Sequence, residues 1–272
     1  MTELPRDLPD GYFVRLDQDG DRARFQPTGH TGGAWNTAEQ HISPMNGLVV
    51  HEIERFCARR GPDGLAVSRL SADILGVLTL DPFEVAVEVV RPGRTIELVE
   101  ATVVAGGRPA LRARVWRTVV QDTEKVAGGE AEPLPGPETA APFALDGVWP
   151  GGYIRSIEAR PVMEPRPGRN TVWVRAKVPV AAGEDPSDLA RLIGLVDSAN
   201  GIAVRQSPEE WLFPNVDLTV HLFRRPVGRW LGLDTTVVFG PDGLGLTSSA
   251  LHDEAGHVGQ AQQALTVRPR PH

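Results

Sequence analysis

Asp197 is the residue of this chain whose type and surroundings first suggest chemistry. It lies between Val196 and the small residues Ser198 and Ala199, inside the most apolar helical run of the sequence. Burying a carboxylate in such a run costs free energy unless the group is hydrogen-bonded or used in function. Asp is also a favoured helix N-cap residue, so a cap or a solvated helix position is the alternative interpretation.

Two amide side chains are the other polar candidates. Gln263 falls in the strand-like run 259–264, where apolar residues would be expected on the inward face. Its neighbour Gln262 would face the opposite side of a sheet, and an exposed edge strand would also explain a run of glutamines. Asn215 follows Pro214 and precedes an apolar strand. Its amide can both donate and accept a hydrogen bond, and a turn before the strand is the alternative.

The two halves of the sequence repeat each other. The segment 44–50 (PMNGLVV) returns 154 positions later as 198–204 (SANGIAV), and the glycine turns at 93 and 106 return 150 positions later. The matching positions of the first half lack the polar set, with Ser43 for Asp197, about Val67 for Asn215 and about Ala113 for Gln263. We therefore predict a single active site at the seam between the two halves, with its catalytic side chains supplied by the second half.

Hydrophobic periodicity predicts the same elements in each half: a hairpin, a long helix and an antiparallel meander. The first half should contain strands 12–17 and 22–27, a helix from about 44 to 60, and strands 65–75, 83–91, 95–105 and 109–120. The second half should contain strands near 152–160 and 171–178, a helix from about 186 to 205, and strands 212–223, 230–239, 245–252 and 257–267. The segment between them is rich in glycine and proline. We predict domains at 1–120 and 151–272, joined by a linker at 121–150.

The composition is that of a globular protein, with 272 residues, 41% of them hydrophobic and 23% charged. A net charge of −7 argues against broad attraction to nucleic acid or an anionic membrane surface. The single cysteine, Cys57, excludes an internal disulfide and a multi-cysteine zinc site, and it fits a reducing compartment. Residues 1–11 lack the apolar core of a signal peptide, and no stretch approaches the length that spans a bilayer. We expect a cytoplasmic protein.

These elements and motifs together resemble hotdog-fold thioesterases. The helix segment 194–204 (GLVDSANGIAV) is similar to the phenylacetyl-CoA type, and the whole chain, with its strand 215–226 (NVDLTVHLFRRP), resembles the double-hotdog acyl-CoA thioesterase II type. The motifs are loose, so the order and spacing of elements carry the resemblance. It implies an α+β tandem (double) hotdog: two long helices on one side, each wrapped by an antiparallel sheet, with the sheets joined into one.

The resemblance also implies an activity, the hydrolysis of acyl-CoA thioesters to free acid and CoA. Asp197 would activate water as a base or attack as a nucleophile, and Gln263 and Asn215 would place the water. Related enzymes usually carry threonine where this chain has Asn215. Backbone amides near Asn46 and Gly47, at a helix N-terminus, would receive the oxyanion.

Three further residues are candidates for substrate binding. His41 lies in the loop before the first helix, although the family often has two glycines where this chain continues with Ile42 and Ser43. Trp35 would line an acyl tunnel, with simple core packing as the alternative. Arg224 would meet a CoA phosphate, with a solvated basic pair as the alternative.

Other functions remain as alternatives because hotdog folds serve several of them. A non-hydrolytic protein that binds acyl-CoA or acyl-carrier protein would keep the apolar tunnel. A hotdog dehydratase would be expected to present a histidine on the helix 192–205, which contains none. We expect no metal, because His51-Glu52 is not followed by a histidine at the zincin spacing, and no cofactor except the CoA of the substrate. Pairing of outer sheet faces into a homo-oligomer is left open.

Overall fold

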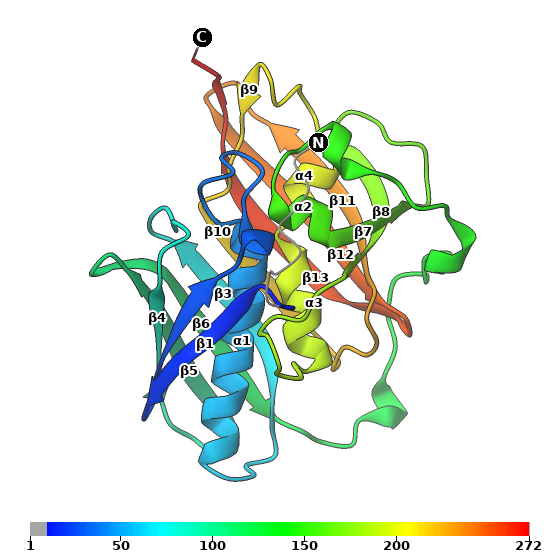
Figure 1. Ribbon diagram of the computed structural model, residues 1–272. Helices are drawn as coiled ribbons and strands as arrows, with labels where there is room; N and C mark the ends of the chain where they lie inside the picture. Colours follow the sequence, from blue (N-terminus) through cyan, green and yellow to red (C-terminus); the bar gives the residue numbers. More distant parts are fainter. Residues whose placement is uncertain (1–9, 272) are drawn as a thin grey trace.

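One antiparallel sheet of twelve strands runs through the molecule (Figure 1). The structure is a computed structural model that describes residues 10–271, so most of the polar start of the chain lies outside the described residues. The first half contributes β1 Phe13–Asp19, β2 Arg22–Pro27, β3 Leu65–Ile74, β4 Phe83–Arg91, β5 Ile96–Ala105 and β6 Arg108–Val119. The second half contributes β7 Ile157–Pro161, β8 Arg169–Ala176, β10 Asp217–Leu222, β11 Leu231–Phe239, β12 Leu244–Asp253 and β13 Gly256–Thr266.

The two halves join edge to edge in this sheet. The strand order is β1-β2-β4-β5-β6-β3-β10-β13-β12-β11-β8-β7, so β3 and β10 form the seam. Leu70 of β3 pairs with Val220 of β10, and both side chains are buried beneath the helices. A separate pair of short strands joins β9 (Trp211–Leu212) to β14 (Arg268–Pro269). The single joined sheet that the resemblance implied is confirmed.

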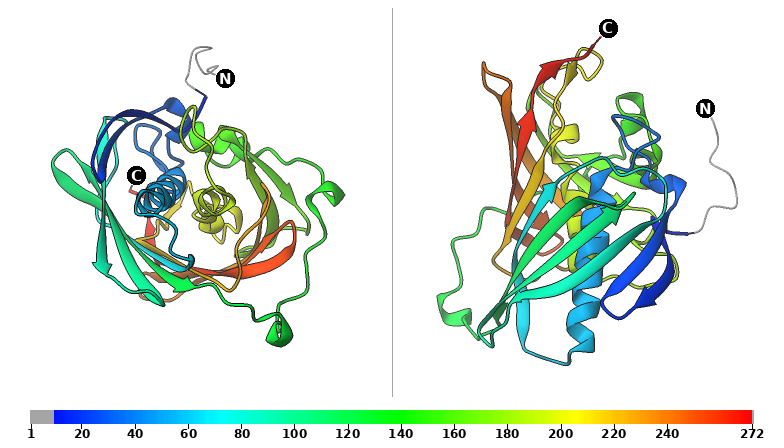
Figure 2. Two further views of the ribbon diagram at one scale, coloured as in Figure 1. Left: turned by 90° about the horizontal axis from the view of Figure 1, so that it is seen from below. Right: turned by 90° about the vertical axis from the view of Figure 1, so that its left-hand side faces the viewer.

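Two helices lie side by side inside the curve of the sheet, as the left view of Figure 2 shows. They are α1 (Ile42–Arg59) and α3 (Asp188–Val196), and they run antiparallel. Ser187, before α3, donates a hydrogen bond to Glu54 near the end of α1, at 2.6 Å. Where the helices cross, a Cβ added to Gly47 would lie 2.9 Å from the Cα of Gly194. The absence of side chains at these two positions lets the backbones approach closely.

Three predicted elements differ from the structure. The helix expected over 186–205 is interrupted at Asp197 and Ser198, with α3 before the break and α4 (Ala199–Ile202) after it. The strand expected at 152–160 begins as the short helix α2 (Gly152–Ser156), and β7 starts only at Ile157. At the start of α2, Gly152 packs so tightly on the Gly29 carbonyl that only glycine fits. The strand expected at 212–223 is divided into β9 and β10, since Pro214 has no N–H to donate to a sheet.

The structure also corrects the register of the internal repeat. Each strand pair contains one register shift, between Leu251 and His252 in β12 and between Val103 and Val104 in β5. Matching the two shifts places Thr247 and Gln263 on Val99 and Val115. The residue equivalent to Gln263 is therefore Val115 rather than Ala113, and Val67 remains the equivalent of Asn215. Ala113 and Val115 both face inward, so the first half still has no amide at this place.

The helices give a similar correction through their mutual contact. A Cβ on Gly47 would approach Gly194 and Ala190, and a Cβ on Gly194 would approach Gly47 and Ser43. Such reciprocal contacts are typical of a two-fold relation, and here they make Gly194 the equivalent of Gly47. Asp197 is thus equivalent to about Val50, not Ser43. Matching Asn46-Gly47 with Asn200-Gly201 was therefore wrong. Gly47 contacts the other long helix, whereas Gly201 lies against Trp149.

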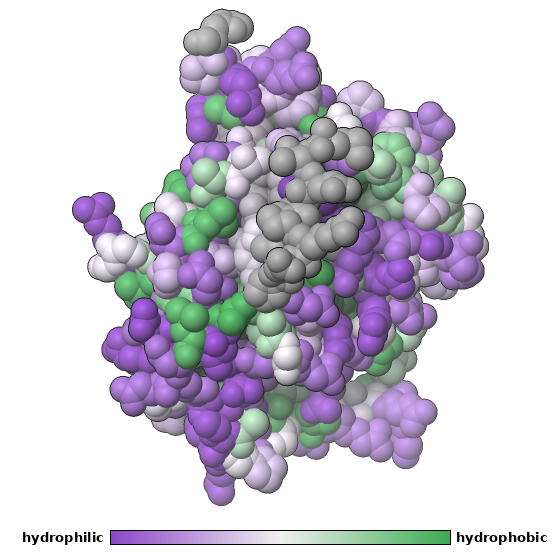
Figure 3. All heavy atoms as spheres, viewed as in Figure 1, coloured by the Kyte–Doolittle hydropathy of each residue, from purple (hydrophilic) through white to green (hydrophobic). Residues whose placement is uncertain are grey.

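The connection between the halves contains only short 3-10 turns, at Glu124–Val126, Pro137–Thr139 and Leu145–Gly147. A further 3-10 turn, Gly29–Thr31, precedes α1. The face seen in Figure 3 is mainly hydrophilic, with hydrophobic residues in small separate groups. Within residues 10–271, no helix has the length and apolar character needed to cross a membrane.

Candidate active site

The break between α3 and α4 positions the carboxyl group of Asp197. This residue is buried, with 3% relative exposure, and its side chain points toward the second half of the sheet. Asp197 Oδ1 accepts hydrogen bonds from Asn215 Nδ2 at 2.6 Å and from Gln263 Nε2 at 2.8 Å. The structure therefore brings together the three polar residues that the sequence singled out.

The sheet decides which glutamine takes part. Gln263 of β13 is buried on the face under the helices, whereas Gln262 is exposed on the opposite face. Asn215 lies just before β10, and a bridge to Leu265 holds its backbone beside β13. Its Nδ2 also donates to the Asp217 carbonyl at 3.0 Å. Both amides are thus fixed with an N–H directed at the same carboxylate oxygen.

Burial dominates the electrostatics of Asp197. It raises the pKa of this carboxyl to about 7, and the nearby charge of Asp217 adds to the increase, while the hydrogen bonds from Asn215 and Gln263 oppose it. A carboxyl group with a pKa near neutrality can hold a proton or release it under ordinary conditions. This property is typical of groups that serve as general bases.

His41 lies beside the second oxygen of the carboxylate. Its Nδ1 is 3.8 Å from Asp197 Oδ2, but Nδ1 accepts a hydrogen bond from the Ser43 N–H and so has no proton to donate. Burial lowers the pKa of His41 to about 3, which leaves the imidazole neutral. Its ring stacks on that of Tyr153, and the Tyr153 hydroxyl bonds to Ser198 at 2.7 Å. Asp197 Oδ2 therefore remains an acceptor without a donor among the described residues.

The first turn of α1 leaves one backbone amide for a ligand. The His41 N–H donates to Thr31, the Ser43 N–H donates to the His41 ring, and Pro44 has no N–H. Among residues 10–271, the Ile42 N–H donates no hydrogen bond, and Ile42 lines the same cavity as Asp197. An unbonded N–H at a helix start favours a developing negative charge.

This finding corrects the prediction for Asn46 and Gly47. Because α1 begins at Ile42, their N–H groups lie in the second turn and bond within the helix. Gly47 serves the contact with α3, and Asn46 is fully buried with no partner for its side chain in the described residues. Pro44, a residue favoured in the first helical turn, was the signal that could have placed the start earlier.

The remaining predicted residues fall in two places. Trp35 lines the cavity beside Asp197 and contacts Trp149 and Phe213 edge to face. Arg224 lies elsewhere, in a bidentate ion pair with Asp253 in which both N–O distances are 2.6 Å. That pair ties the end of β10 to the β12–β13 turn, so its guanidinium is engaged in the fold rather than in the site.

A cavity of about 180 Å³ opens at this constellation. Its walls come from the loop before α1, the chain after β3, and the residues around Asp197 and Asn215. Its counterpart by the internal repeat is a cavity of about 680 Å³, lined among others by Ile53, Val67 and Leu189. The equivalents of the three polar residues are about Val50, Val67 and Val115. Within residues 10–271, the chain thus contains one polar constellation of this kind.

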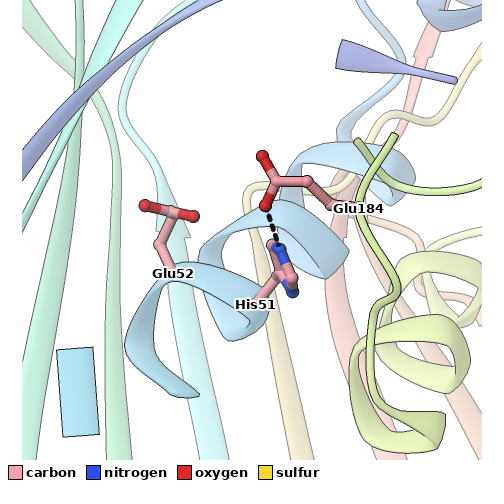
Figure 4. A group of neighbouring side chains, drawn as sticks. All are labelled: His51, Glu52 and Glu184. Carbon is pink, nitrogen blue, oxygen red and sulfur yellow. Dashed lines mark hydrogen bonds and ion pairs between the residues drawn. The ribbon is translucent and has the colours of Figure 1, made fainter. Parts of the chain in front are cut away.

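Another polar cluster joins the two halves. His51 and Glu52 of α1 and Glu184 of the loop before α3 place their ligand-type atoms within 4.8 Å of one another (Figure 4). Arg15 bonds to Glu52 at 2.6 Å and to Glu184 at 2.7 Å, and His51 lies 2.8 Å from Glu184. The Arg15 guanidinium supplies the positive charge that a metal ion would bring, so we interpret the cluster as an ion-pair network.

A twelve-stranded sheet around two antiparallel helices defines a double-hotdog protein, and solved structures share this fold. A tesB protein from Mycobacterium avium subsp. paratuberculosis has a TM-score of 0.68 at 18% identity, covering 94% of this chain and 96% of that one. An acyl-CoA thioesterase II from Mycobacterium marinum has a TM-score of 0.64 at 17% identity, covering 94% and 96%. A hot dog fold protein from Alicyclobacillus acidocaldarius has a TM-score of 0.73 at 15% identity, again covering 94% and 96%.

Family models identify the chain more specifically. The model of the acyl-CoA thioesterase N-terminal domain matches residues 31–118, and that of the acyl-CoA thioesterase C-terminal domain matches residues 130–267. The chain therefore belongs to the acyl-CoA thioesterase family. No curated protein matches its sequence.

Proposed function

We propose that this protein hydrolyses acyl-CoA thioesters to a free acid and CoA, with Asp197 as general base or nucleophile. One observation carries the proposal: two amides hold Asp197 Oδ1, while Oδ2 has no donor among the described residues and borders a cavity. This arrangement fixes the carboxylate and leaves one basic oxygen for the reaction. The family membership supports thioester hydrolysis as the reaction class.

Hydrolysis of the thioester requires water as its only co-reactant. In the general-base form, a water molecule donates one proton to Asp197 Oδ2, and its oxygen attacks the thioester carbonyl. The N–H groups of Gln263 and Asn215 hold Oδ1, so that Oδ2 is the oxygen left to face the water. The Ile42 N–H stabilises the oxyanion, and the C–S bond then breaks. The proton held by Asp197 passes to the leaving sulfur, which gives CoA and the free acid.

CoA enters this reaction as part of the substrate, and the proposal needs no metal or redox cofactor. We place the reaction in the cytoplasm, because the single cysteine, Cys57, suits a reducing compartment. If the protein binds acyl-CoA but leaves the thioester bond intact, the proposal is refuted.

The pH dependence of hydrolysis is the first expected result. Only ionised Asp197 can accept a proton, so kcat/KM should rise with pH and level off above the pKa of about 7. Below that value the activity should fall about tenfold per pH unit, because protonation inactivates the base. A thiol-release assay with a CoA thioester, run from about pH 5 to about pH 9, measures this profile. A flat profile would exclude the ionisation of Asp197 from the reaction.

Asp217→Asn should move the same pH profile without abolishing activity. The charge of Asp217 helps to raise the pKa of Asp197, so its removal should shift the rising limb to lower pH. His41 titrates well outside this range, because its pKa is about 3. An unchanged limb in this variant would indicate that a different group controls the profile.

Gln263→Leu should weaken hydrolysis at neutral pH by roughly 10- to 100-fold. The change removes an N–H donor from a buried carboxylate, and leaving a buried charged group short of a hydrogen bond costs about 1–3 kcal/mol. The pKa of Asp197 should rise further, so part of the lost activity should return at higher pH. Gln262→Leu is the matched control, since Gln262 lies on the exposed face. Equal losses in the two variants would contradict the assigned register.

A further inference from the structure

The candidate active site is assembled from both halves of the chain. The second half supplies the Asp197 carboxylate with the two amides that hold it, whereas the first half supplies the Ile42 N–H at the start of α1. Attack on a thioester needs the base beside the carbonyl carbon and the oxyanion donor at the carbonyl oxygen, so the separation of these two groups matters. A side chain that contacts both segments can set that separation.

Tyr153 of α2 makes contacts in both directions. Toward the second half, its hydroxyl bonds to Ser198 Oγ at 2.7 Å. Toward the first half, its ring stacks on that of His41, with the centroids 4.2 Å apart and an interplanar angle of 29°. Its backbone N–H donates to the Gly32 carbonyl, in the loop before α1, at 3.0 Å. One residue thus joins the segments on either side of the seam.

The bond to Ser198 acts on the direction of Asp197. Both residues lie in the break between α3 and α4, where the Ser198 N–H donates to the Leu195 carbonyl at 3.1 Å. Inside a helix the regular backbone bonds fix the direction of each side chain, and a break lacks part of that restraint. The hydroxyl of Tyr153 supplies an anchor one residue away from the carboxylate.

The stacked ring acts on the oxyanion donor. His41 is the N-cap of α1, and its Nδ1 accepts a hydrogen bond from the Ser43 N–H at 3.1 Å. The orientation of this imidazole therefore helps to fix the first turn, which presents the Ile42 N–H. Tyr153 packs on the face of the imidazole and so restricts its rotation.

Tyr153 itself has no direct part in the reaction. It is fully buried, and it is not among the residues that line the cavity at Asp197. Burial raises the pKa of its hydroxyl above the ordinary value, so the group stays protonated and cannot serve as a base. Any effect of Tyr153 on hydrolysis must therefore pass through Ser198 and His41.

We infer that Tyr153 is a positioning residue, which holds Asp197 and the Ile42 N–H at the separation that thioester hydrolysis needs. The inference rests on the proposed function and adds a residue that does not border the cavity. A misplacement of about 1 Å, caused by a change away from the reacting atoms, can lower a rate about 100-fold. Loss of the Tyr153 hydroxyl should therefore affect catalysis as well as stability.

The test begins with Tyr153→Phe, which removes the hydroxyl and keeps the stacked ring. We expect kcat for thiol release from CoA thioesters to fall at least about tenfold with KM nearly unchanged, because the loss acts in the transition state. The rising limb of the pH profile should move to higher pH, since a displaced Asp197 has weaker hydrogen bonds from its amides and a higher pKa. Ser198→Ala should give the same two changes, and the double variant should be no slower than the slower single variant.

Tyr12→Phe is the matched control. Tyr12 is also buried, and its ring centroid lies 6.0 Å from that of Tyr153. Its hydroxyl accepts a hydrogen bond from Ser156, at 2.9 Å, rather than bonding to Ser198. The control removes the same group from a neighbouring tyrosine, so it should lower stability to a similar extent and leave kcat and the pH profile unchanged.

Each outcome has a distinct meaning. If the wild type is active and Tyr153→Phe matches Tyr12→Phe in kcat and pH profile, the positioning role is overturned and the proposed function stands. Additive losses in Tyr153→Phe and Ser198→Ala would overturn the path through their hydrogen bond. Ser198→Ala keeps the inference testable if Tyr153→Phe does not fold.

A wild-type protein that cleaves none of the thioesters would refute the proposed function. The titration of Asp197, followed by ¹³C NMR of its carboxyl group, does not depend on turnover. A higher pKa of Asp197 in Tyr153→Phe, but not in Tyr12→Phe, would support the positioning contact. Equal values in the wild type and both variants would overturn it.

Discussion

Asp197→Asn protein is expected to release CoA from its thioester substrate about 10²- to 10⁴-fold more slowly than the wild type, which is the usual contribution of general-base catalysis. The asparagine oxygen can still accept the hydrogen bonds from Asn215 and Gln263, so the local packing should persist. What the variant loses is the oxygen that takes a proton from water. Steady-state kcat, measured by thiol release at about pH 8, provides the comparison.

The fold of this variant should not suffer. Burial raises the pKa of Asp197 from 3.8 to about 7, so this carboxyl destabilises the fold increasingly as the pH rises through that interval, and a neutral amide removes the cost. Asp185→Asn is the control, because the Asp185 side chain is 92% exposed in the loop before α3. A loss of activity below about tenfold in Asp197→Asn would rule out both a base and a nucleophile at this position.

Arg15→Leu is expected to lower the free energy of unfolding by about 3 kcal/mol, the lower end of the cost of leaving a buried charge without its partner. Arg15 links Glu52 of α1 to Glu184 of the second half, and the Glu52 side chain is only 4% exposed. Without the guanidinium, the two carboxylates keep only the half-exposed Arg55, which lies 3.6 Å from Glu52 and 3.4 Å from Glu184, and His51 beside Glu184. Urea denaturation at neutral pH measures the change.

A neighbouring surface pair provides the control for this experiment. Arg24 of β2 bonds to Asp17 at 3.1 Å, and both side chains are more than half exposed. Exposed ion pairs contribute about 0–1 kcal/mol, so Arg24→Leu should have a small effect. Equal destabilisation by the two substitutions would show that the buried network does not join the halves in the way that its distances indicate.

Asp197 and Gln263 were predictable because each interrupts an apolar pattern, whereas Asn215 was selected by its place in the family resemblance. A carboxylate in an apolar helix and a glutamine at an inward strand position are visible in sequence without knowledge of the fold. The choice of Gln263 over Gln262 required the sheet register, because a shift of one residue moves the side chain to the other face. The order of helices and strands was recovered in the same way, through periodicity.

The features that the sequence did not predict depend on contacts between segments that are distant in the chain. The helix break at Asp197 arises because its side chain and that of Ser198 bond to groups outside the helix, namely Asn215, Gln263 and Tyr153. The start of α1 at Ile42 moved the available amide away from Asn46 and Gly47. Trp35, Trp149 and Phe213 contact one another from segments that are distant in sequence, and Trp149 comes from a stretch that the composition marked only as a linker.

The most direct test of the proposed hydrolysis is to incubate wild-type protein with a series of acyl-CoA thioesters, from acetyl- to decanoyl-CoA, in water enriched in ¹⁸O and to identify the products by mass spectrometry over many turnovers. Hydrolysis predicts equal amounts of free CoA and free acid from at least one thioester, with one heavy oxygen in each acid molecule, and turnover by Asp197→Asn protein that is slower by about 10²- to 10⁴-fold. Recovery of every thioester intact after prolonged incubation, or equal turnover by Asp197→Asn protein, would contradict the proposal.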